Sequence, residues 1–503
     1  MRTKRVLGIL GAGLLLGGTA VSAGCYDYQK DCLYTLECKG APDGGTSGGT
    51  PEGCDPSKIA DAVVNACGLF VAPTGLDTNA GTKDKPFKTV AAAMAAKGAT
   101  NIYVCAAAMP YAGALVVDKA VTLYGGVDCA KGWVYDATKK TVLTATAGTI
   151  PLTLSSTATG AEINDFSITA AGAAAPGASS IAVMVDHAAV GLTRCALVAG
   201  DGGDGAVGNG GGMVLPAPSG QPGADSVAAA PNGGAGGINT VCGPVAGNGG
   251  NGGLKMSGVG LDGNAGDNNT GGAKGVGQTA SMPCGVGGNG TPGMDMMAGA
   301  VSPGIGALAS TGYTGIDGQP GVDGTAATSG GGGGGSMGGA TSHGAGGGGG
   351  GAGGCGGKHG EGGKFGGSSI ALASLSATVT LTNCTVSVGK GGNGGAGGDG
   401  QFGQPGGDAG PGGKGGAVGP GCSGGTGGKG GNGGNGSGAL GGHSLPIAVV
   451  GTGPVLDAAT KKALTPGAKG AGGKGGTMDA SMNHGADGIA APCWDFASKA
   501  ACK

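Results

Sequence analysis

Glycine, which has no side chain, is the feature that most limits what this chain can fold into. The sequence contains 130 glycines among 503 residues, and aromatic residues make up only 3%. Glycine adds nothing to a hydrophobic core and loses more backbone freedom on ordering than any other residue. A dense conventional core over the whole length is therefore excluded, and only some segments can form one.

The glycines keep a period of three residues over long stretches. Between Gly391 and Gly438 sixteen consecutive triplets can be read, and each begins with glycine except at Ala409 and Val418. Residues 312–326 keep the same period. Three residues make one turn of a polyproline-II helix. Each such helix would present two glycine edges and one edge of side chains, so the sequence predicts several of them packed side by side.

Two alternatives compete with this prediction. Collagen has the same period but needs proline at about 15–20%, and residues 391–438 contain only three prolines. Disorder needs no period, and the uninterrupted runs Gly330–Gly335 and Gly346–Gly351 favour it locally. The Gly-Gly-X tracts resemble the PGRS-type glycine-rich proteins of mycobacteria, also found as secreted proteins in myxobacteria. That resemblance implies polyglycine-II bundles and display at the cell surface.

Residues 1–24 have the pattern of a secretory signal, with a basic start followed by an apolar stretch. The stretch ends in Ser22-Ala23-Gly24-Cys25, which resembles a bacterial lipobox. The resemblance implies lipidation of Cys25, a membrane partner through the lipid anchor, and a location at the outer membrane or cell surface. Ordinary cleavage after Ala23 is the alternative.

Short apolar runs distinguish residues 54–200 from the preceding linker, residues 25–53, whose composition is typical of a flexible tether. Only Val90–Lys97 predicts a helix. The apolar runs are rich in β-branched residues and separated by turn residues, which predicts strands. The predicted strands are Ile102–Cys105, Leu115–Val117, Val121–Tyr124, Val142–Thr144, Leu152–Leu154, Ile163–Ile168, Ile181–Val185 and Leu192–Val198.

Residues 67–129 carry a set of motifs that resembles the opening of secreted, pectate-lyase-like right-handed parallel β-helix proteins. The resemblance implies an all-β fold, a right-handed parallel β-helix with long glycine-rich insertions, and the short helix at 90–97 as its N-terminal cap. A small β-sandwich with disordered linkers is the alternative. The motifs are Val71-Ala72-Pro73-Thr74-Gly75, Asn79-Ala80-Gly81-Thr82, Pro86-Phe87-Lys88-Thr89 and Leu123-Tyr124-Gly125-Gly126.

An internal repeat also favours a solenoid. Residues 179–205 align without gaps to residues 368–394, with 13 identities in 27 positions. A weaker third copy begins at Ile447 and reaches Gly467 with one residue added, and a shorter echo begins at Ile163, 29 residues before Leu192. The predicted division of the chain is 1–24 signal peptide, 25–53 linker, 54–200 β-helix coils with cap, 201–367 glycine-rich insertion, 368–390 coil, 391–443 Gly-Gly-X tract, and 444–503 C-terminal coil with a short glycine-rich tail.

The 15 cysteines predict a disulfide-bonded protein. Lipidation of Cys25 would leave 14, an even number that can pair completely in an oxidising compartment. The spacing leaves most of the connectivity open. Close spacing predicts three pairs, which are Cys54 with Cys67, Cys105 with Cys129, and Cys493 with Cys502.

No residue pattern predicts catalysis, a cofactor or nucleic-acid binding. Beyond the signal the only arginine is Arg194, whereas nucleic-acid binding normally uses a basic patch with arginine forks. A β-helix polysaccharide lyase or hydrolase is the enzymatic alternative. However, no acidic cluster accompanies Arg194 in the sequence, and aromatic platforms for sugars are scarce. Arg194 is therefore predicted to be a solvent-facing strand residue.

No metal site is predicted either. The segment Gly394–Asp399 fits the start of a calcium-binding nonapeptide, which makes Asp399 a weak calcium candidate, but Gln401 stands where a large apolar residue is needed. Four other potential ligands share a glycine-rich stretch that is not expected to hold a metal geometry. These four are His343, Cys355, His359 and Glu361.

These features together predict a structural or adhesive cell-surface lipoprotein without catalysis. Other surface proteins or polysaccharide are its expected partners besides the membrane. A polysaccharide lyase or hydrolase and a calcium-dependent adhesin remain as alternatives.

Overall fold

The computed structural model describes residues 53–212, 215–226, 228–477 and 482–502. The predicted signal peptide, the predicted lipidation site Cys25 and nearly all of the predicted linker lie outside these residues. The described residues belong to one compact unit, Thr50–Lys503. They are mostly extended, with a few short helices, and no helix among them is both long enough and apolar enough to cross a membrane.

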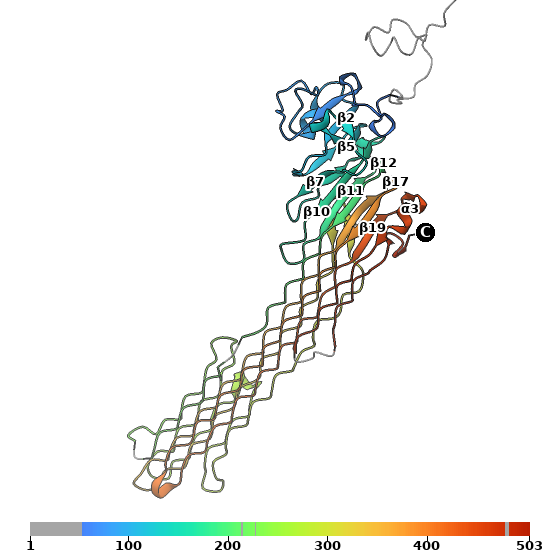
Figure 1. Cartoon of the computed structure of the whole chain (residues 1–503). Helices are drawn as coiled ribbons and strands as arrows, with labels where there is room; N and C mark the ends of the chain where they lie inside the picture. Colours follow the sequence, from blue (N-terminus) through green and yellow to red (C-terminus); the bar gives the residue numbers. More distant parts are fainter. Residues whose placement is uncertain (1–52, 213–214, 227, 478–481, 503) are drawn as a thin grey trace, which may run out of the picture. The chain divides into compact units, whose positions relative to one another are not determined.

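Three largely parallel sheets, here called A, B and C, form the part of the fold with regular strands (Figure 1). Sheet A contains β1 (Leu69–Val71), β2 (Asn101–Cys105), β5 (Thr122–Asp128), β6 (Val134–Tyr135), β9 (Glu162–Asn164), β12 (Ala189–Thr193), β17 (Thr378–Thr382) and β20 (Val455–Leu456). Sheet B contains β3 (Tyr111–Ala112), β7 (Thr141–Ala145), β10 (Phe166–Ala170), β13 (Ala196–Ala199), β18 (Thr385–Val388) and β21 (Leu464–Thr465). Sheet C contains β4 (Leu115–Val117), β8 (Leu152–Leu154), β11 (Ser180–Asp186), β16 (Ser369–Leu375), β19 (Ser444–Val450), β22 (Cys493–Asp495) and β23 (Ala500–Ala501).

The remaining elements are short. A separate hairpin joins β14 (Ala307–Ala309) to β15 (Gly312–Thr314). The α-helices are α2 (Val90–Ala95) and α3 (Ala458–Lys462), and the 3-10 turns are η1 (Pro56–Lys58), η2 (Asn65–Cys67), η3 (Cys129–Lys131), η4 (Ser156–Ala158), η5 (Gly266–Asn269) and η6 (Gly416–Val418).

From β2 to β22 the chain visits the three sheets in a fixed order, A then B then C, and then returns to A. Each circuit therefore adds one parallel strand to each sheet. Because alternate side chains of a strand point to opposite faces, every circuit contributes one set of apolar residues to a common interior. Residues from all three sheets, such as Leu123, Ile168 and Val183, are fully buried there.

The 189-residue offset of the sequence repeat is also the offset between paired residues in neighbouring strands of each sheet. Ser180 pairs with Ser369 in sheet C, Leu192 with Leu381 in sheet A, and Leu197 with Val386 in sheet B. Each pair is separated by 189 residues, so the sequence alignment predicted the neighbouring circuit correctly.

The third copy needs a correction. Ile447 pairs with Leu372, whereas the sequence alignment matches it to Ile370. A shift of two residues keeps the same side chains facing inward, which is why the apolar pattern does not distinguish the two registers. The circuit also gains α3 between β20 and β21, so Leu464 lies opposite Val386.

Two segments predicted as single strands are each two strands in different sheets. The segment Ile163–Ile168 bends at Asp165, and Leu192–Val198 bends at Arg194. Both residues have left-handed backbone conformations, with φ of 61° and 52°, and Asn383 takes the same conformation one circuit later with φ of 53°. One left-handed residue at this position turns the chain from sheet A into sheet B.

The short helix predicted at 90–97 is present as α2, which ends two residues earlier, at Ala95. Its first residue follows Thr89, whose hydroxyl accepts the N–H of Ala92 and so satisfies one free donor of the helix. Val90, Ala93 and Met94 are buried against the interior of the first circuit. On the outer face of sheet A, Phe70 stacks on Tyr103 with ring centroids 5.1 Å apart.

All three glycine-rich excursions leave the sheets at the same corner, between sheet B and sheet C. They connect β13 to β16, β18 to β19, and β21 to β22. The equivalent connection from β10 to β11 is only a short loop. Because each excursion begins and ends one strand away from the next, their chains lie side by side from the start (Figure 1).

His443 is buried where one excursion returns to sheet C. Its Nδ1 accepts the backbone N–H of Ile489 at 2.9 Å, so the neutral ring carries its proton on Nε2, 2.7 Å from the carbonyl oxygen of Ile305. The hydroxyl of Tyr313 lies 3.1 Å from the same nitrogen. Burial lowers the pKa of His443 below its ordinary value of 6.5.

We expect this histidine to make the protein less stable in mild acid. Its pKa is lower in the folded state, so the unfolded state takes up the proton first as pH falls. As pH falls below about 6.5, the free energy of unfolding therefore decreases by up to about 1.4 kcal/mol per pH unit. Urea unfolding at pH 7.5 and pH 5.5 measures this loss in the wild type and in His443→Gln. An equal loss in both proteins would contradict the assignment.

Candidate functional site

The glycine-rich excursions form a hydrogen-bonded array, here called the glycine lattice. It consists of extended runs joined by tight turns, and neighbouring runs are bonded through their backbones at every third residue. The principal runs are 200–212 continuing as 215–226, 231–239, 244–253, 258–266, 271–278, 285–300, 315–339, 343–367, 389–415 and 420–443, with shorter runs at 467–477 and 485–490.

The period of three in the bonding is regular. The N–H groups of Gly202, Gly205, Gly208 and Gly211 donate to carbonyls of the 389–415 run. The carbonyls of residues 203, 206 and 209 in the same run accept N–H groups from the 343–367 run. A chain with three residues per turn directs successive residues to different sides, so each run can bond several neighbours at once.

Two runs lie at the centre of the lattice, and each is bonded to six neighbours. Residues 330–335 donate to or accept from the runs 244–253, 258–266, 271–278, 285–300, 343–367 and 420–443. Residues 346–351 are bonded to the runs 215–226, 231–239, 244–253, 315–339, 389–415 and 420–443.

These two central segments are the uninterrupted glycine runs for which the sequence favoured disorder, and that expectation is wrong. Every residue of Gly330–Gly335 and Gly346–Gly351 is buried. A chain enclosed on all sides has no open edge for a side chain, so every position must be glycine. Peripheral runs keep one open edge and can carry one side chain in three.

The spacing between runs leaves no room for a methyl group at central positions. A Cβ on Gly348 would lie 1.9 Å from the carbonyl oxygen of Gly410, and one on Gly331 would lie 2.1 Å from that of Ala273. Cβ atoms essentially never approach other atoms closer than 3.0 Å. Glycine is therefore required here for close approach of backbones.

Polar side chains at the perimeter have a second role that sequence reasoning missed. They accept N–H groups of the neighbouring run that would otherwise face outward. Asp201 accepts the N–H of Lys390 at 2.9 Å, and Asp204 accepts that of Asn393 at 2.6 Å. Both pairs are separated by 189 residues and lie within the aligned repeat, so its register already placed these residues opposite each other. Further acceptors of this kind are Asn248, Asn251, Asp262, Asn289, Asp295, Asp317, Asn432 and Asn435.

The Gly391–Gly438 tract is not one continuous helix but two antiparallel runs. The chain reverses at η6, and Gly421 then donates back to Gly413. Val418 is in this turn, which explains why a bulky residue is tolerated at a first triplet position. Ala409 lies within a run and is half-buried.

Five disulfides are present in the described residues. Three of them are the pairs that close spacing predicts, Cys54–Cys67, Cys105–Cys129 and Cys493–Cys502. The other two, Cys242–Cys355 and Cys284–Cys422, connect turns of the lattice to long runs that are 113 and 138 residues away in sequence. Sequence spacing could not identify these pairs.

Most cysteines of the described residues are in disulfides, as predicted, but pairing is not complete, because Cys195 and Cys384 are free thiols. They occupy equivalent corners of adjacent circuits, and the N–H of Cys195 lies 3.3 Å from the sulfur of Cys384. Both are buried, at 2% exposure, and burial raises the pKa of the Cys195 thiol. They act as small apolar residues of the interior.

Arg194 is not the solvent-facing strand residue that the sequence predicts. It occupies the corner between β12 and β13 and binds Asp165 with two nitrogens, at 2.7 Å and 3.0 Å. Lys140 and Tyr135 bond the same carboxylate at 3.0 Å and 3.1 Å. The side chain of Asp165 is only 1% exposed, and its hydrogen bonds and charge raise the pKa of Arg194.

The partner of Arg194 was missed although a signal existed. Asp165 precedes Arg194 by 29 residues, the spacing of the short echo between Ile163 and Leu192. Because Arg194 is held in a closed ion cluster by a buried carboxylate, it is not free to act as a catalytic base.

The candidate metal ligands do not converge. Asp399 accepts the N–H of Thr477 at 2.5 Å and its hydroxyl at 2.8 Å. Cys355 is in a disulfide, and Glu361 bonds the side chain of Asn209. His359 lies 2.7 Å from Asp323, and no polar partner reaches Nδ1 of His343. Over the residues that the structure describes, no three His, Cys, Asp or Glu side chains come together.

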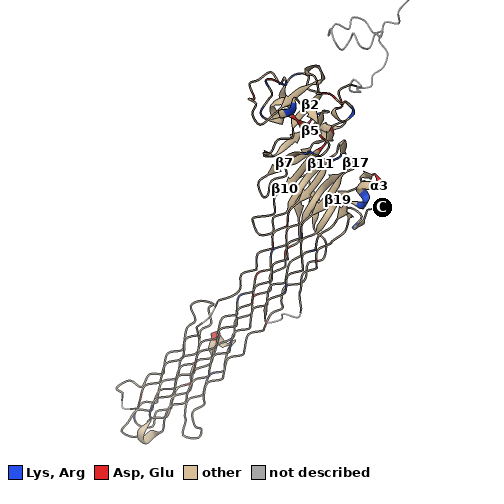
Figure 2. Ribbon diagram, in the orientation of Figure 1, with Lys and Arg blue, Asp and Glu red and all other residues tan. Residues whose placement is uncertain are grey.

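Charged residues are sparse on the lattice. Figure 2 shows isolated positions of both signs along the runs and no block of one sign. Several are paired across neighbouring runs, for example Lys358 with Asp323 at 2.8 Å and Lys364 with Asp317 at 2.9 Å. The hydrogen bond from Lys358 lowers the pKa of Asp323, and the hydrogen bond to Asp317 raises the pKa of Lys364. The charges on the described part of the lattice are therefore scattered and of mixed sign.

Comparisons with protein-family models, with curated proteins and with solved structures return no match. The function must therefore be argued from the geometry.

Proposed function

We propose that this chain is a structural cell-surface protein, in which a right-handed parallel β-helix carries a polyglycine-II bundle outward as a rigid, non-catalytic scaffold for architecture or adhesion. One observation carries the proposal. Three excursions leave the same corner and bond to one another at every third residue, so about half of the sequence is devoted to a single ordered array.

The β-helix is supported by the strand order and by the sequence motifs. Successive strands enter sheets A, B and C in rotation, with parallel and in-register pairing. Parallel crossover connections are right-handed in nearly all proteins, which agrees with the hand implied by the resemblance of residues 67–129. The helix α2 covers the interior at one end, as the ends of such stacks require.

The polyglycine-II arrangement is supported by three independent features. Lateral bonds recur every third residue, central runs have six bonded neighbours, and no glycine within the described runs has positive φ. Positive φ occurs at the turns instead, as at Gly243 and Gly416. Negative φ throughout agrees with the left-handed threefold helix that polyproline-II geometry gives.

The enzymatic and calcium-dependent alternatives receive no support. The single mature arginine is bound to buried Asp165, and the carboxylate of Asp399 is bonded to Thr477. A scaffold role, by contrast, agrees with the disulfides and the polar side chains that are present. Disulfides hold the turns of the lattice, and short polar side chains accept the outward N–H groups of its perimeter.

The location belongs to the same proposal. Five disulfides favour an oxidising compartment outside the cytoplasm. Lipidation at Cys25 would supply the membrane anchor, and surface proteins or polysaccharide would be the partners of the displayed lattice.

Labelling of intact cells tests the proposal. Lys414 and Lys429 are exposed on the lattice, and a membrane-impermeant amine reagent should modify both before the cells are lysed. The wild type should remain with the membrane fraction and incorporate labelled fatty acid. In the matched variant Cys25→Ser, the fatty acid should be absent and the protein released. Modification of both lysines only after lysis would overturn surface display.

A further inference from the structure

A cavity of about 400 Å³ opens beside the N-terminal cap. It lies between the start of α2, the loop after β1 and the segment that contains β3 and the beginning of β4. The volume falls in the range of small-molecule sites in proteins. None of the features assigned above to the scaffold uses this cavity.

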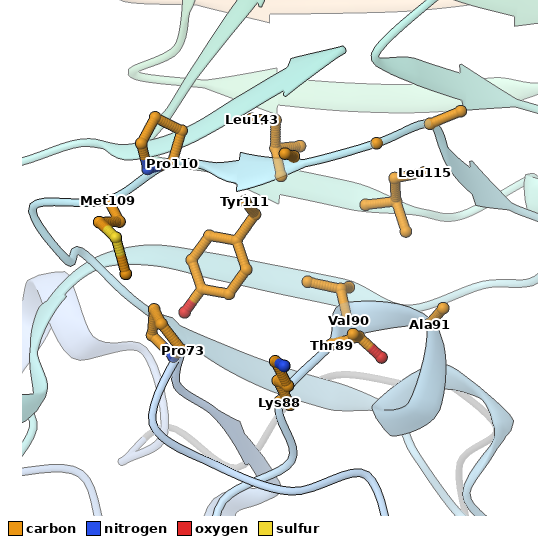
Figure 3. A pocket seen from close by; sticks show the side chains of 13 residues that line it. Pro73, Lys88, Thr89, Val90, Ala91, Met109, Pro110, Tyr111, Leu115 and Leu143 are labelled. Carbon is orange, nitrogen blue, oxygen red and sulfur yellow. The ribbon is translucent and has the colours of Figure 1, made fainter. Parts of the chain in front are cut away.

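The floor of the cavity is apolar and belongs to the interior of the fold. Val90, Leu115 and Leu143 line it, with exposures of 4%, 6% and 2%. Figure 3 shows Leu143 and Leu115 along one side, with Val90 facing them from α2. The rim is also apolar, since Met109 is 69% exposed there. An apolar chain entering the cavity would continue the packing of the core.

The polar groups of the cavity are few, and two are already used. The hydroxyl of Tyr111 donates to the carbonyl oxygen of Val71 at 3.2 Å, and burial raises the pKa of this phenol. The hydroxyl of Thr89 lies 3.1 Å from a carboxylate oxygen of Asp77 and accepts the N–H of Ala92. Neither group is available as the main anchor of a charged ligand.

Lys88 is the single charged residue in the lining. None of the ion pairs of the described residues includes its ammonium group, although its backbone N–H is bonded to Asp77. Figure 3 shows its side chain at the edge of the cavity, beside Thr89 at the start of α2. The cavity thus combines an apolar floor with one unpaired cation at its edge.

We propose that this cavity binds one single-chain alkyl carboxylate of medium length, with its carboxylate at Lys88 and its tail on Val90, Leu115 and Leu143. The charge of Lys88 favours an anionic head group, and the apolar lining favours a hydrocarbon body. A volume of about 400 Å³ accommodates one such chain and excludes a two-chain membrane lipid.

Calorimetric titration of the full-length protein with decanoate, and with 1-decanol as the uncharged analogue, tests both parts of the site. The wild type should bind decanoate more tightly than decanol. Lys88→Met should weaken the affinity for decanoate about tenfold, which corresponds to the loss of one hydrogen bond to a charged group. It should leave the affinity for decanol unchanged. The matched control is Lys97→Met, because Lys97 follows the same helix but does not line the cavity, and it should bind both ligands as the wild type does.

A filling variant separates this cavity from binding elsewhere. Ala112→Trp should weaken the affinity for both ligands at least tenfold. Ala114→Trp serves the same purpose, because both alanines line the cavity and are exposed. Circular dichroism identifies which of the two remains folded. The proposal is overturned if the wild type does not bind decanoate at millimolar concentration, if a folded filling variant binds normally, or if Lys88→Met affects decanoate and decanol equally.

Discussion

Replacing Gly348 by alanine is expected to destabilise the protein by at least about 3 kcal/mol, a large effect for the addition of one methyl group. The new Cβ would lie 1.9 Å from the carbonyl oxygen and 2.6 Å from the carbonyl carbon of Gly410. Both contacts are with backbone, which cannot rotate away as a side chain can. The two runs must separate, and the row of hydrogen bonds between them is lost.

Urea unfolding of three variants measures this effect against matched controls. Gly212→Ala adds the same methyl group at a peripheral position where no atom lies within 4 Å of the new Cβ. It should change stability by no more than about 0.5 kcal/mol. Lys414→Leu, at an exposed third position, should be similarly mild. Equal losses in Gly348→Ala and Gly212→Ala would contradict close packing of the runs.

Removing the Cys284–Cys422 disulfide with serine at both positions is expected to cost about 5 kcal/mol. The bond closes a loop with a sequence separation of 138 residues, and the chain-entropy relation predicts more stabilisation for longer loops. The bond also joins the turn before the 285–300 run to the 420–443 run, so its loss frees that turn to separate from the lattice.

The terminal disulfide Cys493–Cys502 provides the comparison, because its separation is only 9 residues. Its replacement by serines should cost roughly 2.5 kcal/mol by the same relation. Guanidinium unfolding of the two double variants gives both values. A smaller loss for the lattice disulfide than for the terminal one would show that the lattice runs are not constrained in the way described.

Local sequence patterns predicted the strands, the α2 cap and the neighbouring circuit well. These features depend on residues close together, or on a repeat that keeps its register over 189 residues, as between Leu192 and Leu381. An all-β chain with parallel sheets is confirmed. The corners were missed, because Asp165 and Arg194 take left-handed conformations that interrupt apparently continuous strands.

Amino-acid composition alone did not predict that the uninterrupted glycine runs of the lattice are ordered. Uninterrupted glycine looks like disorder when a chain is considered alone, since glycine has the highest entropy to lose. In the lattice the same runs are the most enclosed, because only a chain without side chains can have six neighbours. Disulfides such as Cys242–Cys355 were similarly hidden, since they depend on how three excursions assemble.

Amide hydrogen exchange of the central runs tests the central claim most directly. If Gly330–Gly335 and Gly346–Gly351 are enclosed by six bonded neighbours, their amides should exchange about a thousandfold or more slower than in an unstructured peptide. Their protection should approach that of β11 and β16 in sheet C. Exchange of these twelve glycines at the unprotected rate, while β11 and β16 stay protected, would contradict the lattice.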